Sequence, residues 1–440
     1  MNVYFHTFGC RANQYDTEVV RQAFTEQGAV VVDDPAAADL TVINSCTVTH
    51  ESETKLRRFV RHVSRTSRAE TIVMGCAAAL DDGAIAALPS VRAVVPNADP
   101  ATVLRAAGFS PPSLLSVSSP PDPLSSSRRG GTNGRHRALL KIQDGCDEHC
   151  TFCATTLARG ANRSRTVTEL VEEARMLAEH HAEIVLTGVH IGTYGQDWGL
   201  TDPGRQPGDD ENLRTSSFGF PRARARGQST LGSLLESLVT AVPGVRFRLS
   251  SVEATEVDDT LARLLIEAPR HVAAHLHAPL QSGSNRILKR MGRHWYTAET
   301  YRARIDWLAE RLPVFGLGAD VIAGFPGETD DDHHASLTLL NALPFTYLHV
   351  FPFSVRPDAA AARLPDPLDP GLINGRAREL RELGEAKARA YRGRRKGQRA
   401  DGVVAGRAGG RVDVLTEDYL SVYLPTDRWD GRPRFELIVD

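Results

Sequence analysis

Short apolar runs alternate with amphipathic helical patterns along the first hundred residues. Strand-like runs cover residues 3–8, 40–43 and 71–74, and helical patterns cover residues 16–27 and 51–67. Such alternation is typical of a parallel sheet whose strands are connected by helices. Residues 1–107 are therefore predicted to form an α/β domain.

A stretch rich in Pro, Ser and Gly, residues 108–134, separates that domain from a second alternation and is predicted to be a linker. Strand patterns follow at 138–142, 183–187, 246–250, 275–280, 317–322 and 347–351, with helical patterns at 168–180, 231–242, 258–268, 298–311 and 330–342. This predicts a parallel, barrel-like sheet over residues 135–370 with its function at the strand carboxyl ends. Residues 196–230, which interrupt the pattern with Gly, Pro, Asp and Arg, are expected to be a disordered surface insertion.

Residues 371–440 show a helical pattern at 373–391 and then a short all-β pattern. Basic residues crowd the junction within twenty residues that hold a single acid, Asp401: Arg392, Arg394, Arg395, Lys396, Arg399, Arg407 and Arg411. Such a cluster beside a small β-barrel favours contacts with a phosphate backbone. A solvated basic helix end is the alternative.

Composition narrows the class of protein. The chain has 440 residues, 41% of them hydrophobic, which excludes a disordered or fibrous protein. Its net charge of −2 argues against a protein that binds polyanions over its whole surface. The amino-terminal segment does not resemble a signal peptide, and no run of eighteen apolar residues occurs. We therefore expect a cytoplasmic protein without a membrane span.

The six cysteines fall into two sets of three, a wide triad of Cys10, Cys46 and Cys76 and a tight triad of Cys146, Cys150 and Cys153. Their density is far too low for a disulfide scaffold, so thiols, thiolates or metal ligands are expected. Three thiolates on a four-iron cluster leave one iron open to a small molecule. The alternatives are a zinc knuckle that borrows His149 for the tight triad and buried apolar cysteines for the wide one.

The wide triad is predicted to converge in space. Each of its cysteines follows a strand-like run, and the carboxyl ends of parallel strands lie at one edge of a sheet. Cysteines 36 and 30 residues apart in sequence can therefore meet.

The spacing Cys146-x3-Cys150-x2-Cys153 resembles that of the radical S-adenosylmethionine (SAM) enzymes, and further motifs resemble the methylthiotransferase branch. These motifs are FGCRANQYDTE (8–18), INSCTVT (43–49), MGCAA (74–78), QDGCDEHCTFC with ARG (143–160), HLHAPLQSGSNRILKRMGR (275–293), ADVIAGFPGETDDD (319–332) and HVFPFSVRP (349–357). DYLSVYLP (418–425) is similar to the family's RNA-binding TRAM barrel. The residues 13–15 and 46–49 look most like the branch that modifies threonylcarbamoyladenosine in tRNA.

The resemblance implies a fold, cofactors and partners. The fold is α/β: an N-terminal parallel-sheet domain, a central partial (β/α)6 radical SAM barrel and a small C-terminal TRAM-like β-barrel. The implied cofactors are two 4Fe-4S clusters, held by the two cysteine triads, and SAM. The implied partners are tRNA and an electron-donor protein such as a flavodoxin or ferredoxin, with the chain acting as a monomer.

The resemblance also implies a reaction: SAM bound at the open iron of the tight triad is cleaved to a radical that removes hydrogen from C2 of the adenine, and the wide triad's cluster supplies or relays sulfur. Candidate SAM contacts are Gly188, Ser250, Glu253, Gln281, Asp320 and Arg159. Candidate RNA contacts are Arg392, Arg394, Arg395, Lys396 and Arg399. His275 and His277 alternate on one strand and are predicted to be satisfied core histidines.

Departures from the family pattern leave alternatives open. Residues 154–157 replace a segment that usually holds a Pro, residues 358–359 replace a usual Gly-Thr, and His333-His334 stands where an aromatic residue is common. The alternatives are a methylthiotransferase acting on isopentenyladenosine or on a ribosomal protein side chain, and a non-catalytic iron–sulfur or zinc RNA-binding protein.

Overall fold

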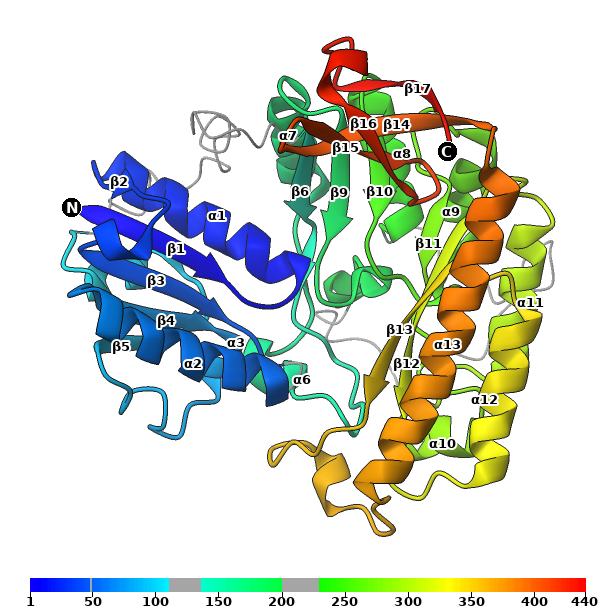
Figure 1. Ribbon diagram of the computed structural model, residues 1–440, viewed down its shortest axis with the longest axis horizontal. Coiled ribbons are helices and arrows are strands. Elements are labelled where there is room, and N and C mark those ends of the chain that lie inside the picture. Colours follow the sequence, from blue (N-terminus) through cyan, green and yellow to red (C-terminus); the bar gives the residue numbers. More distant parts are fainter. Residues whose placement is uncertain (48–49, 111–135, 200–228) are drawn as a thin grey trace. The chain divides into compact units, whose positions relative to one another are not determined.

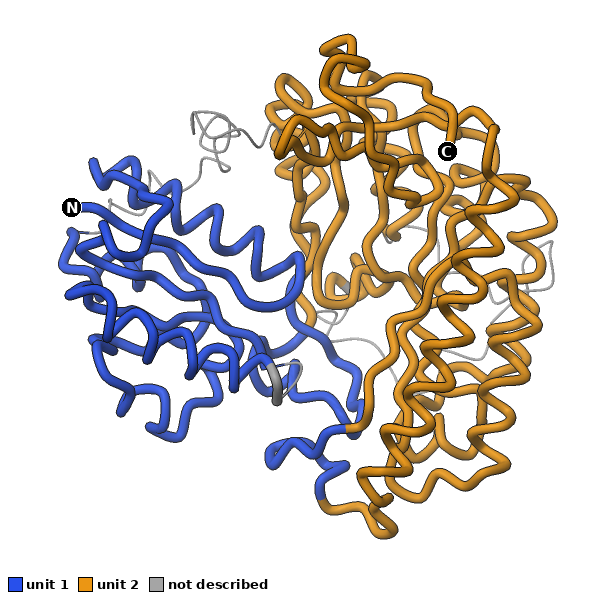
Figure 2. Tube along the Cα trace, in the orientation of Figure 1, with its two compact units in different colours: residues 1–126, 144–161, 354–362 blue, residues 127–143, 162–353, 363–440 orange. Residues whose placement is uncertain are grey.

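The computed structural model describes residues 1–47, 50–110, 136–199 and 229–440. The chain forms two compact units, one of residues 1–126, 144–161 and 354–362 and the other of residues 127–143, 162–353 and 363–440 (Figure 2). Most of the predicted linker and of the predicted insertion lies outside the described residues, at 111–135 and 200–228. In the described part of the chain, no helix combines the length and the apolar character needed to cross a bilayer.

The first unit is built on a five-stranded parallel sheet in the order β2-β1-β3-β4-β5 (Figure 1). Its strands are β1 Asn2–Thr7, β2 Val30–Val31, β3 Leu40–Ser45, β4 Glu70–Gly75 and β5 Val91–Pro96. Its helices are α1 Arg11–Glu26, η1 Pro35–Ala37, α2 His50–Thr66, α3 Cys76–Ala79, α4 Pro100–Ala106 and α6 Thr155–Arg159, and η5 Ala360–Arg363 begins within it. The predicted parallel α/β sheet is confirmed, although the sequence pattern did not indicate β2, β5 and α4.

Two apolar layers explain why both faces of this sheet are covered. On one face α1 and α4 contribute Phe24 and Leu104 to a cluster that includes Val42 of β3. On the other face α2 contributes Leu56 and Val60, whose spacing places them on one side of the helix. Because β3 is buried along its whole length, its carboxyl end is fixed at the sheet edge by packing from both sides.

The second unit contains the two parallel sheets β10-β9-β6 and β11-β12-β13. Their strands are β6 Arg137–Lys141, β9 Glu183–Thr187, β10 Arg246–Leu249, β11 His275–His277, β12 Gly316–Ala323 and β13 Tyr347–Pro352. The single bridges Phe247–Val272 and Ser251–His277 connect the sheets, so these strands follow one another in chain order. This is the strand order of the predicted partial barrel, while closure of the barrel stays a prediction.

Five helices confirm the helical patterns predicted from the sequence: α7 Val167–Ala178, α8 Leu231–Ala241, α9 Asp259–Glu267, α11 Ala298–Ala309 and α12 Asp330–Ala342. The short helix α10 Asn285–Arg290 was not predicted. Side chains of Thr or Asp cap the first turns of α7, α8, α9, α11 and α12. Short elements lie in the loops: β7 Gln143–Asp144, β8 Arg163–Ser164, η2 Ile191–Thr193, η3 Gln196–Gly199 and η4 Ala254–Glu256.

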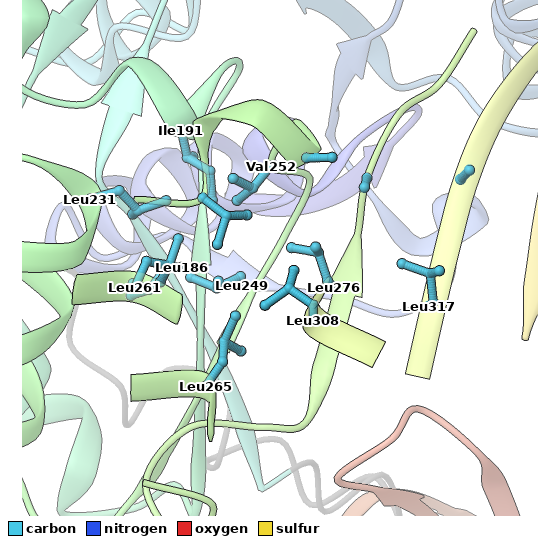
Figure 3. Close-up of a cluster of buried hydrophobic side chains, with 14 of the residues drawn as sticks. Leu186, Ile191, Leu231, Leu249, Val252, Leu261, Leu265, Leu276, Leu308 and Leu317 are labelled. Carbon is cyan, nitrogen blue, oxygen red and sulfur yellow. The ribbon is translucent and has the colours of Figure 1, made fainter. Parts of the chain in front are cut away.

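Leucines fill the space between strands and helices of this unit (Figure 3). Leu186, Leu249 and Leu276 come from successive strands, and Leu261 and Leu308 come from α9 and α11. Each is at most 1% exposed. Burial of a Leu side chain stabilises the fold by roughly 1.5–3 kcal/mol, so this layer fixes the strands whose carboxyl ends carry the predicted site residues.

The chain ends in a long helix and a small antiparallel sheet within the second unit. The helix is α13 Pro370–Arg395, and the sheet has the order β16-β15-β14-β17. Its strands are β14 Arg399–Ala408, β15 Arg411–Thr416, β16 Ser421–Pro425 and β17 Arg434–Ile438, with η6 Thr426–Arg428 in a loop. Val404, Val412 and Val422 are among the residues of its separate apolar core, so the predicted all-β end of the chain is confirmed.

A buried ionic network joins this small sheet to the parallel strands of the same unit. Glu183, at the amino end of β9, accepts hydrogen bonds from Arg137 at 2.6 Å, Arg246 at 2.7 Å and Arg248 at 3.0 Å. Arg248 also donates to the main-chain oxygen of Thr416 at 2.7 Å. Burial opposes the charge of Glu183, but the three arginines outweigh it and hold the pKa of this carboxyl well below its usual value.

Candidate functional site

The wide cysteine triad lies at one edge of the first unit's sheet, as predicted. Cys10 precedes α1, Cys46 follows β3 and Cys76 opens α3, so each comes directly after one of the neighbouring strands β1, β3 and β4. The Sγ atoms of Cys10 and Cys76 lie 3.7 and 3.8 Å from the same atom, Asn13 Oδ1. Three thiols thus converge from three strand ends.

Gly9 permits the close approach of Cys46. Its φ of +103° lies in the left-handed region, and an added Cβ would stand 2.6 Å from Cys46 Cβ and 2.7 Å from Cys46 Sγ. A side chain at this position would therefore occupy the space between Cys10 and Cys46.

Two buried asparagines tie the strand ends together around the triad. Asn13 Nδ2 donates to the main-chain oxygens of Phe8 at 3.0 Å and Ser45 at 2.9 Å. Asn44 Nδ2 donates to the main-chain oxygen of Asn13 at 2.9 Å. These amides fix the spacing of the chain around the thiols, a role that the sequence analysis missed because an isolated Asn carries no recognisable pattern.

The surroundings of the wide triad suit a metal cluster held by thiolates. Burial raises the pKa of the Cys76 thiol to about 11, although the nearby Arg159 guanidinium acts in the opposite direction. Only the thiolate is a ligand, so iron binding has to displace a proton here. Three sulfur ligands at one sheet edge, with Cys46 and Cys76 buried and Cys10 exposed, fit a 4Fe-4S cluster with one open iron.

The tight triad occupies the loop before α6, and this loop belongs to the same unit. Gly145 has a φ of +70°, and an added Cβ would stand 1.9 Å from the main-chain oxygen of Ala161, so the loop requires glycine here. The backbone N–H of Cys146 donates to Gly160 at 3.0 Å, which closes the loop. This gives the tight triad a short, fixed backbone frame.

Backbone amides of this loop point at sulfur. The N–H of Glu148 lies 3.4 Å from Cys146 Sγ, and the N–H of Thr155 lies 3.3 Å from Cys153 Sγ. Both amides hold the sulfur atoms in fixed positions beside the backbone. The three half-buried thiols therefore have an environment that fits cluster ligands, which is the role predicted for them.

Arg159, predicted to contact SAM, makes other contacts. Its Nε lies 3.1 Å from Cys76 Sγ, and its Nη2 donates to Asn13 Oδ1 at 2.5 Å and Asp16 Oδ2 at 2.9 Å. Its Nη1 donates to Asp144 Oδ1 at 2.9 Å. Burial alone would lower the pKa of Arg159, but Asp16, Cys76 and Asp144 outweigh burial and raise the pKa above its usual value. The side chain is therefore a cation held in place by residues near both cysteine triads.

Four further predicted residues lie at or beyond the carboxyl ends of strands in the second unit: Gly188, Ser250, Glu253 and Gln281. Gly188 packs so closely that an added Cβ would stand 2.6 Å from the main-chain oxygen of Gln143. Gln281 has a φ of +65°, which is strained for a residue with a side chain and is typical of functional loops. Their contact with SAM remains a prediction.

Asp320 differs from this group because it lies within β12. Its Oδ1 is 3.0 Å from His277 Nε2 and 3.2 Å from His349 Nδ1. Burial raises the pKa of Asp320, but the two imidazoles outweigh burial and lower it. His277 is hydrogen-bonded at both ring nitrogens, since its Nδ1 lies 3.0 Å from the Tyr347 hydroxyl, and His275 Nε2 lies 2.8 Å from the same hydroxyl. Both rings are buried, as predicted for core histidines.

A polar cluster around Glu253 was missed by the sequence analysis. Glu253 pairs with buried Arg293 and accepts from Trp295 Nε1 at 2.5 Å. His190 Nε2 lies 2.7 Å from Glu256 Oε1 in the neighbouring loop. The acids of residues 253 and 256 were visible in the sequence, but their partners are distant along the chain and only the fold brings them together.

The structure separates the predicted RNA contacts into two kinds. Arg395 is buried and pairs with Asp418 at 2.7 Å and Glu417 at 2.8 Å, so its side chain fixes α13 to the small sheet. Arg399 is 80% exposed. The side chains of Arg394 and Lys396 are also exposed, and Arg392 is half-buried, so these four can reach a partner and Arg395 cannot.

Comparison with known proteins identifies the same two regions. Residues 2–96 match "Uncharacterized protein family UPF0004", and residues 140–340 match the radical SAM superfamily. The solved structure of the radical SAM methyltransferase TsrM from Kitasatospora setae aligns with a TM-score of 0.56 and 14% identity over 82% of this chain and 75% of that one. This likeness concerns the fold alone.

Relatives similar in sequence extend over most of the chain. The threonylcarbamoyladenosine tRNA methylthiotransferase MtaB of Bacillus subtilis is 35% identical over 88% of this chain and 81% of its own length. Its namesake in Thermotoga maritima is 33% identical over 88% and 82%. The tRNA-2-methylthio-N(6)-dimethylallyladenosine synthase of Sorangium cellulosum is 32% identical over 88% and 78%. With both cysteine triads in place, the chain belongs to the radical SAM methylthiotransferase family, whose enzymes use SAM and 4Fe-4S clusters.

Proposed function

We propose that this enzyme adds a 2-methylthio group to N6-threonylcarbamoyladenosine next to the anticodon of tRNA. The observation that carries the proposal is the match to two relatives named for that reaction, at 35% and 33% identity over most of the chain. The six cysteines in their two converging settings support the same chemistry.

Different residues of the chain hold the clusters and orient SAM. Cys146, Cys150 and Cys153 would hold a cluster that would supply the electron for SAM cleavage, and Cys10, Cys46 and Cys76 would hold a second cluster that would supply or relay sulfur. The loops that carry Gly188, Ser250, Glu253 and Gln281 orient SAM and exclude water. An unpaired anticodon-loop base is a cheaper target than a paired one because little stacking has to be broken.

The proposal assigns a task to each region. Residues 1–107 carry the auxiliary cluster, residues 135–370 carry the SAM chemistry, and residues 371–440 contact tRNA through half-buried Arg392 and the exposed side chains of Arg394, Lys396 and Arg399. A flavodoxin or ferredoxin is the proposed electron donor. We propose that the enzyme works as a monomer in the cytoplasm, where its tRNA substrate is found.

The test is mass spectrometry of nucleosides from tRNA incubated anaerobically with the reconstituted enzyme, SAM and dithionite. Two substrates are compared, tRNA carrying threonylcarbamoyladenosine and tRNA carrying isopentenyladenosine. We expect a methylthio mass gain on the first alone. A gain only on the second would move the enzyme to the reaction of the Sorangium relative, and SAM cleavage without any gain would point to a protein or another RNA.

Metal analysis tests the cluster assignment separately. The reconstituted enzyme should contain about eight iron atoms per chain, and Cys46→Ala and Cys153→Ala should each retain about four. Bound SAM should alter the electron paramagnetic resonance spectrum of the Cys46→Ala variant, which keeps the tight triad, and not that of Cys153→Ala. Zinc instead of iron, or a spectrum insensitive to SAM, would favour a non-catalytic RNA-binding protein.

A further inference from the structure

The helix α2 carries the densest basic stretch in the first unit. Residues 54–69 contain six Lys or Arg and no Asp or Glu, although the whole chain has a net charge of −2. The stretch is TKLRRFVRHVSRTSRA, and it follows Cys46 by only eight residues. The sequence pattern alone did not single it out.

The basic side chains share one face of the helix. Leu56, Val60 and Val63 are buried on the side toward the sheet. The opposite side presents what we call the α2 basic face: Arg57, Arg58, Arg61, His62 and Arg65, all of which border the same surface hollow. Arg57 is half-buried and the other four are exposed.

The positive charges of this face outnumber the acids beside it, since Glu53 is the one acid among the residues that border the hollow. Within the described part of the chain, none of its four arginines forms an ion pair, whereas Arg92 of the same unit pairs with Glu70 at 2.8 Å. Like charges one turn apart on a helix destabilise it by a few tenths of a kcal/mol per pair. A polyanion that approaches such a face would relieve this repulsion.

One end of the α2 basic face lies near Cys46 of the wide triad, and Arg356 joins the two through hydrogen bonds. Glu53, which borders the same hollow, accepts a hydrogen bond from Arg356 Nη1 at 3.1 Å. The same Nη1 donates to Thr47 Oγ1 at 2.8 Å, and Thr47 directly follows Cys46. From Arg57 to Arg65 the helix rises by about 12 Å, so the basic face forms a track that leads from the sheet edge with Cys46 outward.

We propose that the α2 basic face binds the phosphate backbone of the tRNA and guides the anticodon loop to the sheet edge of the wide triad. This inference rests on the proposed function. Arginine favours it because the planar guanidinium binds phosphate oxygens in pairs. The exposed large apolar residues of the described chain all lie elsewhere than α2, so the face lacks the apolar centre typical of protein interfaces.

The test compares two charge-matched double variants of the full-length enzyme. Arg61→Gln with Arg65→Gln removes two positive charges from the α2 basic face. Arg105→Gln with Arg175→Gln removes two from α4 and α7, where both arginines are exposed and, among the described residues, form no ion pair. The dissociation constant of tRNA is measured by fluorescence anisotropy at several KCl concentrations.

We expect the α2 variant to bind tRNA on the order of tenfold or more weakly, with the slope of log K against log [KCl] reduced by about one for each lost contact. The control variant should match the wild type in both. Iron content and SAM cleavage without tRNA should be unchanged in either variant, because among the described residues neither pair of arginines contacts a cysteine.

The outcomes separate this inference from the proposed function. If the wild type methylthiolates tRNA while the α2 variant binds tRNA with an unchanged slope, the surface assignment is overturned and the function stands. If the wild type neither binds nor modifies tRNA, both fall. If the variant binds tRNA normally but loses activity only with a flavodoxin as donor and not with dithionite, the face binds the acidic donor and the RNA assignment is overturned.

Discussion

Replacing Arg159 by glutamine should destabilise the first unit by about 3–5 kcal/mol, the usual cost of removing one partner from a buried ion pair. Arg159 and Asp16 are both 8% exposed, so the substitution removes the Arg159 cation from a carboxylate that has little access to water. Asp144 is 23% exposed and regains part of its hydration, which places the cost toward the lower end of the range.

A matched substitution sets the scale. Arg92→Gln removes the same charge from the same unit, but Arg92 and Glu70 are 42% and 57% exposed. An exposed pair of this kind contributes about 0–1 kcal/mol. The difference in stability between Arg159→Gln and Arg92→Gln therefore measures the effect of burying the ion pair, because both variants lose one arginine.

The chain provides an internal probe for the measurement. All four tryptophans, Trp198, Trp295, Trp307 and Trp429, belong to the second unit, so tryptophan fluorescence during urea unfolding reports that unit alone. Hydrogen exchange of peptides from α1 and β3 reports the first unit. We expect Arg159→Gln to speed exchange in the first unit of the apoprotein while the tryptophan transition stays unchanged.

Two results would refute this reasoning. If exchange in α1 and β3 is the same in Arg159→Gln as in Arg92→Gln, the ion pairs of Arg159 contribute nothing beyond a surface pair. If the tryptophan transition shifts by as much as the exchange of the first unit, the effect is not confined to the unit that holds the contacts.

Three further substitutions test other parts of the structure. Gly9→Ala should lower the iron content of the wide triad. The control is Gly83→Ala, at a similar φ of +100°, where no atom lies within 4 Å of the added Cβ and only backbone strain is expected. Equal iron content in both variants would count against the close approach at Gly9. The pKa of Glu183 is lowered in the folded state, so its charge stabilises the fold above about pH 4.5 and this stabilisation is lost as the pH falls below that value. In Glu183→Gln, the loss of stability at acid pH, followed by tryptophan fluorescence, should therefore be smaller than in the wild type. The variant should also be about 3–5 kcal/mol less stable at neutral pH. Arg395→Gln should lower stability without changing the salt dependence of tRNA binding. Arg399→Gln should reduce the salt dependence of tRNA binding without changing stability. A reduced salt slope in Arg395→Gln would show that Arg395 is accessible to RNA.

The sequence was informative where one hydrophobic run determines one element. The strands before Cys10, Cys46 and Cys76 were predicted to within about two residues at each end, and the parallel arrangement then placed the cysteines at one edge. Short elements such as β2, of two residues, escaped detection because a periodic pattern needs several residues to appear.

Contacts between polar residues distant in sequence could not be predicted. Arg159 and Asp16 are 143 residues apart, and Arg356 and Thr47 are 309 apart, so no local pattern joins them. The same limit explains Arg395, whose sequence neighbours suggest an exposed basic cluster while the fold turns this one side chain toward Asp418. Side-chain direction at a helix end depends on what packs there, which a sequence pattern alone does not specify.

Arg159 has a consequence for how the two cysteine triads depend on each other. It stands in the helix that follows the tight triad, yet its Nε lies 3.1 Å from Cys76 of the wide triad. Asp144, two residues before Cys146, holds the other side of the same guanidinium. Because a rigid planar cation cannot turn toward one partner without leaving the other, a change in the charge at Cys76 alters the force on the loop that carries the tight triad. The chain therefore returns to its first unit at residues 144–161 with a charged contact that joins the loop of the tight triad to Cys76 of the wide triad.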